Sequence, residues 1–499
     1  MAPLLRQASA QTELLIGEVF RSAARSVPNR TAVDLGERSL TFGEIDRAAN
    51  RLGRTMRDLG AARGERVAVV GAMNPSLVPV FAASAKLGAV YAAIDPELSP
   101  DVLLDVLQIA RPSLVVIDDE RATSSRELAT ELGVPAIGLA RLVRSSAGDD
   151  DRELPVAGPN ELDPQAVFFR ANGIGRPKGA VLSHRVQYLR SQFGALPGRR
   201  GPAVCPYSLS RSTAWEIALR QWHARGRVVL VDPRDPTALC EAVEAQEAAH
   251  LTAPPSLLRE LLALATADPD RARQLRSLRE INLDGRAAPR QLLDEVASVL
   301  PRAKIRLVHG CVEAGDLACL EGSDLYRKPG SCGVPAPFGE LIVEQTGELC
   351  VRGPLLFDGY LGDADATAAA VVDGWYHTGD VAELDREDFL TILGPLRDLI
   401  QTRSGAVAPI EVETAIAGHS GVGDVAVIGL PSPDLDQVVC AVVVPAPGHD
   451  PPSLAELQSF CENRIETFKQ PGRLLVVDAI PRTEATRQVQ RPLLYEQLA

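Results

Sequence analysis

The chain has 499 residues, of which 45% are hydrophobic and 23% charged, as in a globular protein of more than one domain. The net charge of −13 argues against a general binder of nucleic acid or anionic membranes. The eight cysteines are scattered without a CxxC pair, and no Cys/His group has the spacing of a metal site. Neither a secretion signal nor a membrane-spanning apolar run is evident. We therefore expect a cytoplasmic protein with reduced, mostly buried cysteines and with no nucleic-acid or membrane partner.

The first third of the chain alternates between helices and strands. Thr41 and Glu44 form a capping box at the start of a helix whose apolar residues recur at helical spacing as far as Met56. Further strands are expected at 66–71, 89–94 and 114–117, and further helices at 79–87 and 102–109. The polar residues 141–165 are expected to form a loop. This alternation predicts a doubly wound, mostly parallel sheet covered on both faces.

A glycine-rich stretch at 169–184 follows a short apolar run, and a helix is expected to start at its end, at Ser183. Its central part contains Gly173, Gly175, Pro177, Lys178 and Gly179. Glycines let backbone N–H groups approach an anion closely, and the lysine adds positive charge. Taken alone, the stretch fits a surface turn between a strand and a helix as well as it fits a phosphate loop.

The α/β alternation then resumes, and the pattern of expected elements changes at two points further along the chain. Strands are expected at 228–231, 280–283 and 305–308, and helices at 238–248 and 257–264. From about residue 338 short alternating strands dominate, and a Gly-Pro pair at 394–395 interrupts the pattern. We expect a large N-terminal domain over residues 1–393, with a β-rich subdomain at about 338–393. A hinge at 394–398 and a C-terminal domain over 399–499 follow.

Several motifs occur in a fixed order along nearly the whole chain: 284–289 (DGRAAP), 309–313 (HGCVE), 347–354 (GELCVRGP) and 375–380 (WYHTGD). Together they resemble the adenylate-forming superfamily of acyl-CoA synthetases, peptide-synthetase adenylation domains and luciferases. The resemblance implies an α/β fold with a large N-terminal domain of doubly wound sheets, a β-rich subdomain and a small, mobile α+β C-terminal lid. It also implies activation of a carboxylate by ATP, followed in most members by transfer of the acyl group to a thiol.

The resemblance assigns roles to individual residues. It places the nucleotide ribose on Asp380, adenine near Gly285, and Mg²⁺ on Glu313, whose hard oxygen ligands suit a hard cation. It places ATP phosphates on the loop that contains Gly173, Gly175 and Lys178, and it gives Thr378 and the hinge residue Arg397 further contacts in the site.

Four catalytic elements depart from the family pattern. Residues 170–174 (RANGI) replace the hydroxyl-rich half of the phosphate loop, and Pro395 replaces an arginine at the hinge. Arg403 and Ser404 replace a pair of glycines in a C-terminal loop. Depending on the register, Arg487 or Gln488 falls at the position of the catalytic lysine, whose loss typically costs about 10²–10³ in rate.

The acyl pocket is expected to involve Tyr207, Ser208, Arg211, Trp215, His309, Gly310 and Cys311. Tyr207 and Trp215 either stack on an aromatic acid or are ordinary core aromatics. Arg211 either binds a second carboxylate of the substrate or lies on the surface.

Two kinds of function therefore stay open. The first is a ligase that activates a small, possibly aromatic carboxylic acid with ATP and Mg²⁺ and passes it to CoA or to the phosphopantetheine of an acyl carrier protein, in specialised metabolism. The alternative is a degenerate member of the family that does not adenylate. Such a protein acts as an acyltransferase from a preformed acyl-CoA or as a non-catalytic binding protein, and either kind is expected as a monomer or a homodimer.

Overall fold

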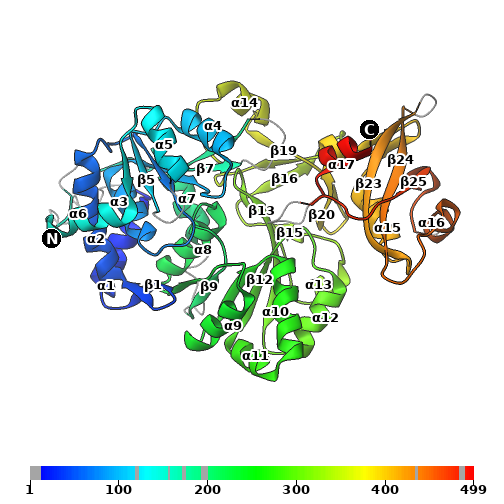
Figure 1. Ribbon diagram of the computed structural model, residues 1–499, viewed down its shortest axis with the longest axis horizontal. Helices are drawn as coiled ribbons and strands as arrows, with labels where there is room; N and C mark the ends of the chain where they lie inside the picture. Colours follow the sequence, from blue (N-terminus) through cyan, green and yellow to red (C-terminus); the bar gives the residue numbers. More distant parts are fainter. Residues whose placement is uncertain are drawn as a thin grey trace, which may run out of the picture. The chain divides into compact units, whose positions relative to one another are not determined.

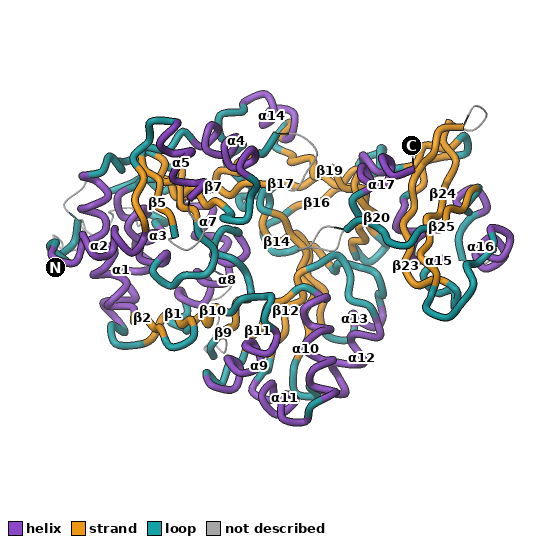
Figure 2. The backbone as a smooth tube through the Cα atoms, viewed as in Figure 1, coloured by secondary structure: helices purple, strands orange, loops and turns teal. Residues whose placement is uncertain are grey.

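The computed structural model describes residues 13–118, 123–154, 158–170, 176–192, 201–432, 436–462, 464–482 and 489–498. The chain divides into two compact units (Figures 1 and 2). The first comprises Met1–Glu340 with Arg352–Tyr376, and the second comprises Leu341–Val351 with His377–Ala499. The β-rich region expected at 338–393 is thus shared between the two units. The hinge expected at 394–398 stays a prediction.

One sheet of the first unit has six strands in the order β6-β5-β3-β4-β7-β8. They are β3 (Arg66–Val70), β4 (Val90–Ile94), β5 (Leu114–Ile117), β6 (Ala136–Gly138), β7 (Pro164–Arg170) and β8 (Lys178–Ser183). All neighbours are parallel except β7 and β8, which pair antiparallel. The doubly wound, mostly parallel sheet expected from the sequence is confirmed.

The other sheet of this unit has nine strands in the order β15-β14-β13-β12-β11-β9-β10-β1-β2. They are β1 (Thr31–Leu35), β2 (Arg38–Thr41), β9 (Ala203–Cys205), β10 (Val228–Leu230), β11 (His250–Ala253), β12 (Glu280–Asp284), β13 (Lys304–Cys311), β14 (Gly315–Glu321) and β15 (Val334–Pro335). Its central strands are parallel, and antiparallel strands flank them at both edges.

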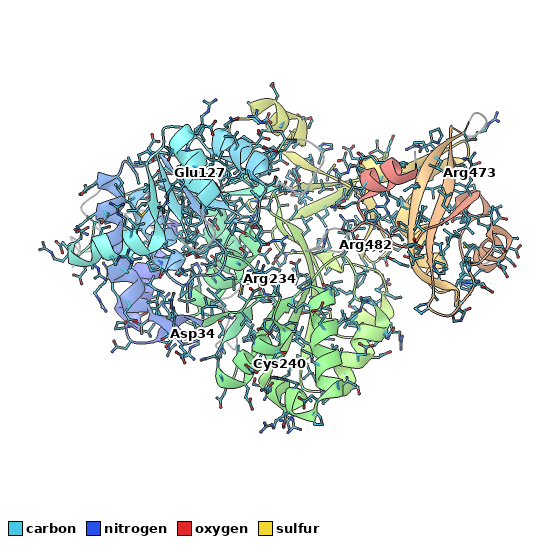
Figure 3. All side chains as sticks on the ribbon, viewed as in Figure 1. Asp34, Glu127, Arg234, Cys240, Arg473 and Arg482 are labelled. Atoms are coloured by element: carbon cyan, nitrogen blue, oxygen red, sulfur yellow. The ribbon has the colours of Figure 1, made fainter. Side chains whose placement is uncertain are left out.

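Helices alternate with these strands along the chain. They are α1 (Ile16–Ser26), α2 (Phe42–Asp58), α3 (Leu77–Leu87), α4 (Pro100–Ala110), α5 (Thr123–Glu131), α6 (Leu139–Ser145), α7 (His184–Ser191), α8 (Ser212–His223), α9 (Pro236–Ala245), α10 (Pro255–Ala267), α11 (Pro269–Gln274), α12 (Arg290–Val299), α13 (Asp324–Arg327) and α14 (Ala364–Ala370). The capping box expected at Thr41 and Glu44 starts α2. Six of the eight cysteines are buried, and all eight are free thiols. One of the buried cysteines, Cys240, lies on α9 (Figure 3).

The loop expected at residues 141–165 was wrong at both ends, and at its end β7 already begins at Pro164. Helix α6 continues to Ser145, and a short 3₁₀ helix, η1 (Ser146–Gly148), follows it. Buried Leu139 and Leu142 fix the helix to the core, although its exposed residues are polar enough to resemble a loop.

A five-stranded sheet follows in the chain, in the order β16-β17-β19-β18 with β20 also paired to β19. Its strands are β16 (Glu340–Val343), β17 (Glu348–Arg352), β18 (Val371–Val372), β19 (Trp375–Leu384) and β20 (Leu390–Pro395). The β-rich texture expected from the sequence is therefore confirmed, and the boundary between the two units crosses β17 and β19.

The rest of the second unit is a small α+β fold. Its sheet has the order β22-β21-β24-β23, with β25 parallel to β24. The elements are β21 (Ile400–Thr402), β22 (Gly405–Val407), β23 (Val422–Ser432), β24 (Asp436–Pro445), β25 (Arg473–Val476), α15 (Pro409–Ile416), α16 (Leu454–Cys461) and α17 (Arg491–Leu498). Separate apolar clusters cover its two faces, one against α15 and α16 and the other against α17. The expected fold class, a large N-terminal and a small C-terminal α/β part, is confirmed.

Candidate functional site

The glycine-rich stretch includes the end of β7 and all of β8, which pair antiparallel as a β-hairpin. Arg170, the last residue of β7, lies opposite Lys178, the first residue of β8, in the antiparallel register. The interpretation as a turn leading directly into a helix was therefore wrong, because β8 intervenes before α7, whose N-cap is Ser183. Gly173 and Gly175 lie outside the described residues. The hairpin places two cationic side chains at the base of the loop.

Close packing along β8 brings a second segment beside this base. A Cβ on Gly179 would lie 2.8 Å from side-chain atoms of Phe169 and Val167, so a larger residue does not fit here. On the other side of β8, the N–H of Val181 donates to the carbonyl of Gly359 at 2.9 Å, and the N–H of Leu361 donates to Gly179 at 2.8 Å. The segment 357–361 therefore runs along β8 like a further strand. It places Tyr360 next to Lys178, whose Nζ lies 4.8 Å from the centre of the phenol ring.

Glu313 lies at the same place, just after β13, and its side chain is fully buried at 0% exposure. Its Oε1 accepts a hydrogen bond from Nη1 of Arg170 at 2.8 Å and one from the hydroxyl of Tyr360 at 3.1 Å. Its Oε2 is buried and has no hydrogen-bond partner among the described residues. Because an unpaired buried carboxylate is costly, the guanidinium of Arg170 is the group that makes this burial tolerable.

Two side chains near Glu313, Cys311 and Tyr360, have pKa values well above their usual ranges. Burial, and then the charge of Glu313, raise the pKa of the Cys311 thiol to about 12. Burial raises the pKa of the Tyr360 phenol, and the charge of Glu313 adds to the effect. Both groups are therefore neutral near neutral pH, and Arg170 is the cation that donates to the Glu313 carboxylate.

Arg190 holds the backbone around Glu313 and was missed by the sequence reasoning. Its side chain is 1% exposed, and its guanidinium donates to the carbonyl of Val312 at 2.9 Å and to the carbonyl of Leu355 at 2.9 and 2.6 Å. It also pairs with Glu216 at 3.4 Å. Arg190 belongs to no recognisable motif, and the only sequence signal is a charged residue on the otherwise inward side of a short helix.

The loop expected near adenine lies beside the expected acyl pocket. The N–H of Gly285 donates to the carbonyl of Val308 at 3.1 Å. The hydroxyl of buried Tyr207 donates to Asp284 at 3.3 Å, and burial raises the pKa of that carboxyl group. Ser208 shares a hydrogen bond of 2.8 Å with Ser210. The hydrogen bond from Tyr207 to Asp284 therefore joins the segment of Tyr207 and Ser208 to the loop of Gly285.

Other expected pocket residues lie on the strand that leads to Glu313. His309 is buried on β13, and burial lowers its pKa to about 4. The next residue, Gly310, faces the carbonyl of Gly315, which would lie 2.4 Å from an added Cβ. Only glycine fits at this point, because the obstacle is backbone.

Trp215 and Arg211 occupy opposite environments. Trp215 is fully buried, stacks on Phe81 with ring centres 3.9 Å apart, and donates from Nε1 to the carbonyl of Leu209 at 2.8 Å. The interpretation of Trp215 as a core aromatic is the one that this packing favours. Arg211 is exposed at the start of α8, which agrees with the surface interpretation.

In the second unit, the residues around Asp380 are held by strand β17. Thr378 donates from Oγ1 to the carbonyl of Leu349 at 2.8 Å and accepts from the N–H of Asp380 at 3.1 Å. The N–H of Gly379 donates to Oε1 of Glu348 at 2.9 Å. These bonds fix the backbone on which the Asp380 carboxylate is carried.

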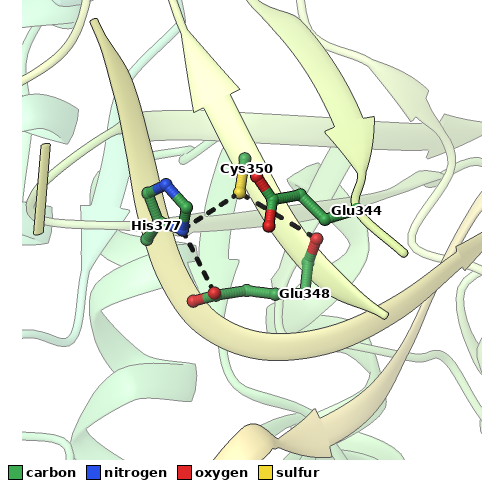
Figure 4. A group of neighbouring side chains, drawn as sticks. All are labelled: Glu344, Glu348, Cys350 and His377. Carbon is green, nitrogen blue, oxygen red and sulfur yellow. Dashed lines mark hydrogen bonds and ion pairs between the residues drawn. The ribbon is translucent and has the colours of Figure 1, made fainter. Parts of the chain in front are cut away.

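A group of potential metal ligands lies beside this strand: Glu344, Glu348, Cys350 and His377, whose ligand atoms are all within 4.8 Å of one another (Figure 4). The sequence shows no Cys/His group with the spacing of a metal site, since Cys350 and His377 are 27 residues apart. They come together because β17 and β19 are neighbours in the sheet. Nδ1 of His377 lies 3.1 Å from Oε2 of Glu348 and 3.4 Å from the sulfur of Cys350, and the other oxygen of Glu348 binds Gly379. These hydrogen bonds account for the positions of Glu348, Cys350 and His377 without a cation, so we assign the group a structural role.

The remaining expected site residues lie in the C-terminal part. Arg397 is largely exposed, and the neighbouring Asp398 forms an ion pair of 3.0 Å with Arg491, which also contacts Glu413. Arg487 and Gln488 lie outside the described part of the chain, as do Ala171 and Asn172.

The resemblance places Mg²⁺ on Glu313, and the residues around this carboxylate do not fit that ion. Magnesium binds carboxylate oxygens with near-octahedral geometry and usually retains several waters. Here Oε1 already accepts two hydrogen bonds, one of them from a guanidinium, and Oε2 has no exposed surface for hydrated ions. The guanidinium of Arg170 and the hydroxyl of Tyr360 therefore hold the position that a metal ion on this carboxylate would need.

Comparison with known families gives two matches that together span most of the chain. Residues 20–361 match the family described as AMP-binding enzyme, and residues 411–487 match the AMP-binding enzyme C-terminal domain.

Curated relatives match over nearly their whole length. Feruloyl-CoA synthase from Amycolatopsis sp is 30% identical over 92% of this chain and 94% of its own. The fatty acid–[acyl-carrier-protein] ligase ScoC of Streptomyces coeruleorubidus is 27% identical, covering 94% of both chains. The 3-hydroxybenzoate–CoA ligase of Aromatoleum sp. (strain CIB) is 26% identical, covering 95% of both.

Solved structures show the same fold. ATP-bound MatB from Rhodopseudomonas palustris gives a TM-score of 0.85 at 22% identity, covering 96% of this chain and 98% of that one. The o-succinylbenzoate–CoA synthetase MenE from Bacillus subtilis, in complex with ATP and magnesium ion, gives 0.83 at 22% identity, covering 96% and 99%.

Proposed function

Since this chain belongs to the AMP-binding enzyme family of the adenylate-forming superfamily, we propose that it is a ligase that activates a small aromatic carboxylic acid with ATP and transfers the acyl group to a thiol. The curated relatives named above support the reaction class, because they are ligases of carboxylic acids with CoA or with an acyl carrier protein.

The observation that carries the proposal is the pair of cations at the base of the hairpin loop. Arg170 and Lys178 lie opposite each other at the ends of β7 and β8. A loop flanked by two fixed positive charges suits a polyphosphate, since charge-assisted hydrogen bonds to phosphate oxygens are among the strongest in proteins. The side chain of Arg170 is 62% exposed and can therefore reach a ligand.

The chain also retains other groups that the reaction needs. We assign the ribose hydroxyls to Asp380, because a carboxylate accepts two hydrogen bonds in a fork. The segment of Tyr207 and Ser208, joined to the loop of Gly285 by the hydrogen bond from Tyr207 to Asp284, is the proposed contact surface for the acid and the adenine. Among acids, the aromatic class is favoured by the names of two relatives, feruloyl-CoA synthase and 3-hydroxybenzoate–CoA ligase.

The acceptor is CoA or the phosphopantetheine of a carrier protein. Both kinds of acceptor occur in the names of the relatives, and both present the same terminal thiol. A comparison of CoA with a phosphopantetheinylated carrier protein as the acceptor distinguishes the two.

A product assay tests the proposal. The full chain is incubated with ATP, CoA and a panel of ferulate, benzoate and hydroxybenzoates, and acyl-CoA and AMP are measured by mass spectrometry. We expect equal amounts of the two products with at least one aromatic acid. Lys178→Ala lowers this turnover, whereas Arg185→Ala, which changes an exposed residue at the start of α7, leaves it unchanged.

A second function is favoured by the same ion pair that occupies Glu313. In this alternative the chain does not adenylate and instead transfers an acyl group from a preformed acyl-CoA to another acceptor, while the guanidinium of Arg170 stays on Glu313 without a phosphate ligand. Turnover of benzoyl-CoA in the absence of ATP, together with no AMP in the first assay, would support this function over the ligase.

A further inference from the structure

The Arg170–Glu313 pair joins two residues that are 143 positions apart, at the place where the family resemblance expects a metal-binding glutamate. Nη1 of Arg170 lies 2.8 Å from Oε1 of Glu313, which is a normal distance for a charge-assisted hydrogen bond. The arginine also stands where the resemblance expects a hydroxyl. The side chain at position 170 therefore holds a permanent positive charge against this carboxylate.

The carboxylate itself offers no second binding direction to an ion. The hydroxyl of Tyr360 takes the other hydrogen bond to Oε1 at 3.1 Å, and Oε2 is buried without a partner among the described residues. A divalent cation on Oε1 would have to displace Tyr360 or lie against the guanidinium, where like charges repel each other.

Charge balance around Glu313 is complete without an added ion. One carboxylate faces one guanidinium, and the charge of Glu313 raises the pKa of Arg170 still further. Arginine cannot lose its proton under any physiological condition, so this cation does not dissociate from the site as a metal does.

The guanidinium has donors to spare for a ligand. It carries five N–H groups in a fixed fork, and the contact with Glu313 uses Nη1. Because the Arg170 side chain is 62% exposed, the remaining donors are accessible from solvent, beside Lys178 at the base of the hairpin.

We propose that the guanidinium of Arg170 takes the place of a divalent cation at Glu313, so that this chain binds a polyphosphate without a metal ion on that carboxylate. Arg170 compensates the buried charge of Glu313 and at the same time donates to the phosphate. The inference rests on the proposed function only in the use of ATP as a probe.

Calorimetric titration of the full chain with ATP, in EDTA and in MgCl₂, tests whether polyphosphate binding needs a metal ion. We expect the wild-type dissociation constant to differ by less than about threefold between the two buffers. In Arg170→Gln, which keeps a hydrogen-bond donor but removes the charge, Mg²⁺ is expected to strengthen ATP binding by about tenfold or more.

Titration with Mn²⁺ in the absence of nucleotide, followed by electron paramagnetic resonance, tests whether Arg170 takes the place of a divalent cation at Glu313. Arg170→Ala is expected to bind Mn²⁺ about tenfold more tightly than the wild type, because the buried carboxylate has lost its cation. The double variant Arg170→Ala/Glu313→Gln removes that gain. Arg185→Ala is the matched control for the loss of one surface arginine, and circular dichroism confirms that each variant is folded.

Two results would overturn the inference. One is a wild-type ATP affinity that increases by about tenfold or more with Mg²⁺; the other is equal Mn²⁺ binding by the wild type and Arg170→Ala. If the wild type binds ATP in neither buffer, the proposed ligase function fails, and the Mn²⁺ titration alone then decides whether Arg170 replaces the cation.

Discussion

At the scale of residues, two arginines organise the candidate site around the buried carboxylate of Glu313. Glu313 is compensated by Arg170, and the backbone around Glu313 is held by Arg190. Arg170 was visible in the sequence as a departure from the family pattern. Arg190 was not, because its partners Val312 and Leu355 contribute carbonyl groups, which any residue type supplies.

Replacement of Arg190 by methionine is expected to destabilise the first unit strongly. The change leaves the carbonyl groups of Val312 and Leu355 without this donor and removes one of the two arginines paired with Glu216, which costs about 3 kcal/mol in the free energy of unfolding. Arg185→Met on the same helix is exposed and should stay within about 0.5 kcal/mol. Urea unfolding followed by circular dichroism measures both values, and equal stability of the two variants would contradict the role of Arg190.

His184 should make the protein sensitive to acid. It is fully buried, its Nδ1 accepts from the N–H of Ile16 at 3.2 Å, and burial lowers its pKa from 6.5 to about 4. The unfolded chain binds a proton more readily than the folded chain, so stability is complete above pH 6.5 and falls as the pH drops towards 4.

The contribution of His184 amounts to about 2 kcal/mol between about pH 7.5 and pH 5. His184→Gln keeps an acceptor for Ile16 but does not titrate, so it should lose about 2 kcal/mol less over this range than the wild type. Parallel pH profiles of the two proteins in urea unfolding would show that His184 is not the titrating group.

At the scale of elements, the hairpin of β7 and β8 and the segment 357–361 bring the site together. The sequence predicted the loop and the start of α7, but it did not predict β8, since a strand of six residues that ends on the helix cap carries no clear period. It also missed the pairing of 357–361 with β8, because irregular backbone that pairs with a strand has no sequence signature. The longer helices and strands were predicted well, because their apolar residues recur at a regular spacing over many positions.

Gly179→Ala tests the packing of this hairpin. Its added methyl group would lie 2.8 Å from Phe169 and Val167, so we expect a loss of about 1–3 kcal/mol in the free energy of unfolding. Gly148→Ala is the matched control, because no atom lies within 4 Å of its added methyl group. A Gly179→Ala protein as stable as the control would mean that Phe169 and Val167 can move away from the added methyl group without cost.

A second prediction concerns β17. Glu348→Ala removes the acceptor of the Gly379 N–H and the partner of His377, so Asp380 loses part of its support. We expect nucleotide affinity to fall by about fivefold to tenfold, while the free energy of unfolding changes by about 1 kcal/mol. Calorimetry with AMP measures the first quantity, and a stability loss without any change in affinity would refute this support.

At the scale of the whole molecule, the order of the motifs in the sequence predicted the fold, and the comparisons place the chain in the family over almost its full length. The boundary between the two compact units crosses β17 and β19, and the domain bounds expected from the sequence stay a prediction. Chain segments that leave a unit and return to it are a tertiary property, which local sequence patterns do not encode. In the described part of the chain, no helix is long and apolar enough to cross a membrane.

The central claim is that the chain adenylates an aromatic acid with ATP phosphates held at the base of the β7–β8 hairpin. Acid-dependent exchange of labelled pyrophosphate into ATP tests it most directly, because exchange requires the acyl-adenylate but no thiol acceptor. We predict exchange with at least one aromatic acid, reduced by about 10²-fold or more in Lys178→Ala. Absence of exchange with every acid of the panel, in a folded protein that transfers the acyl group of benzoyl-CoA without ATP, would contradict the claim.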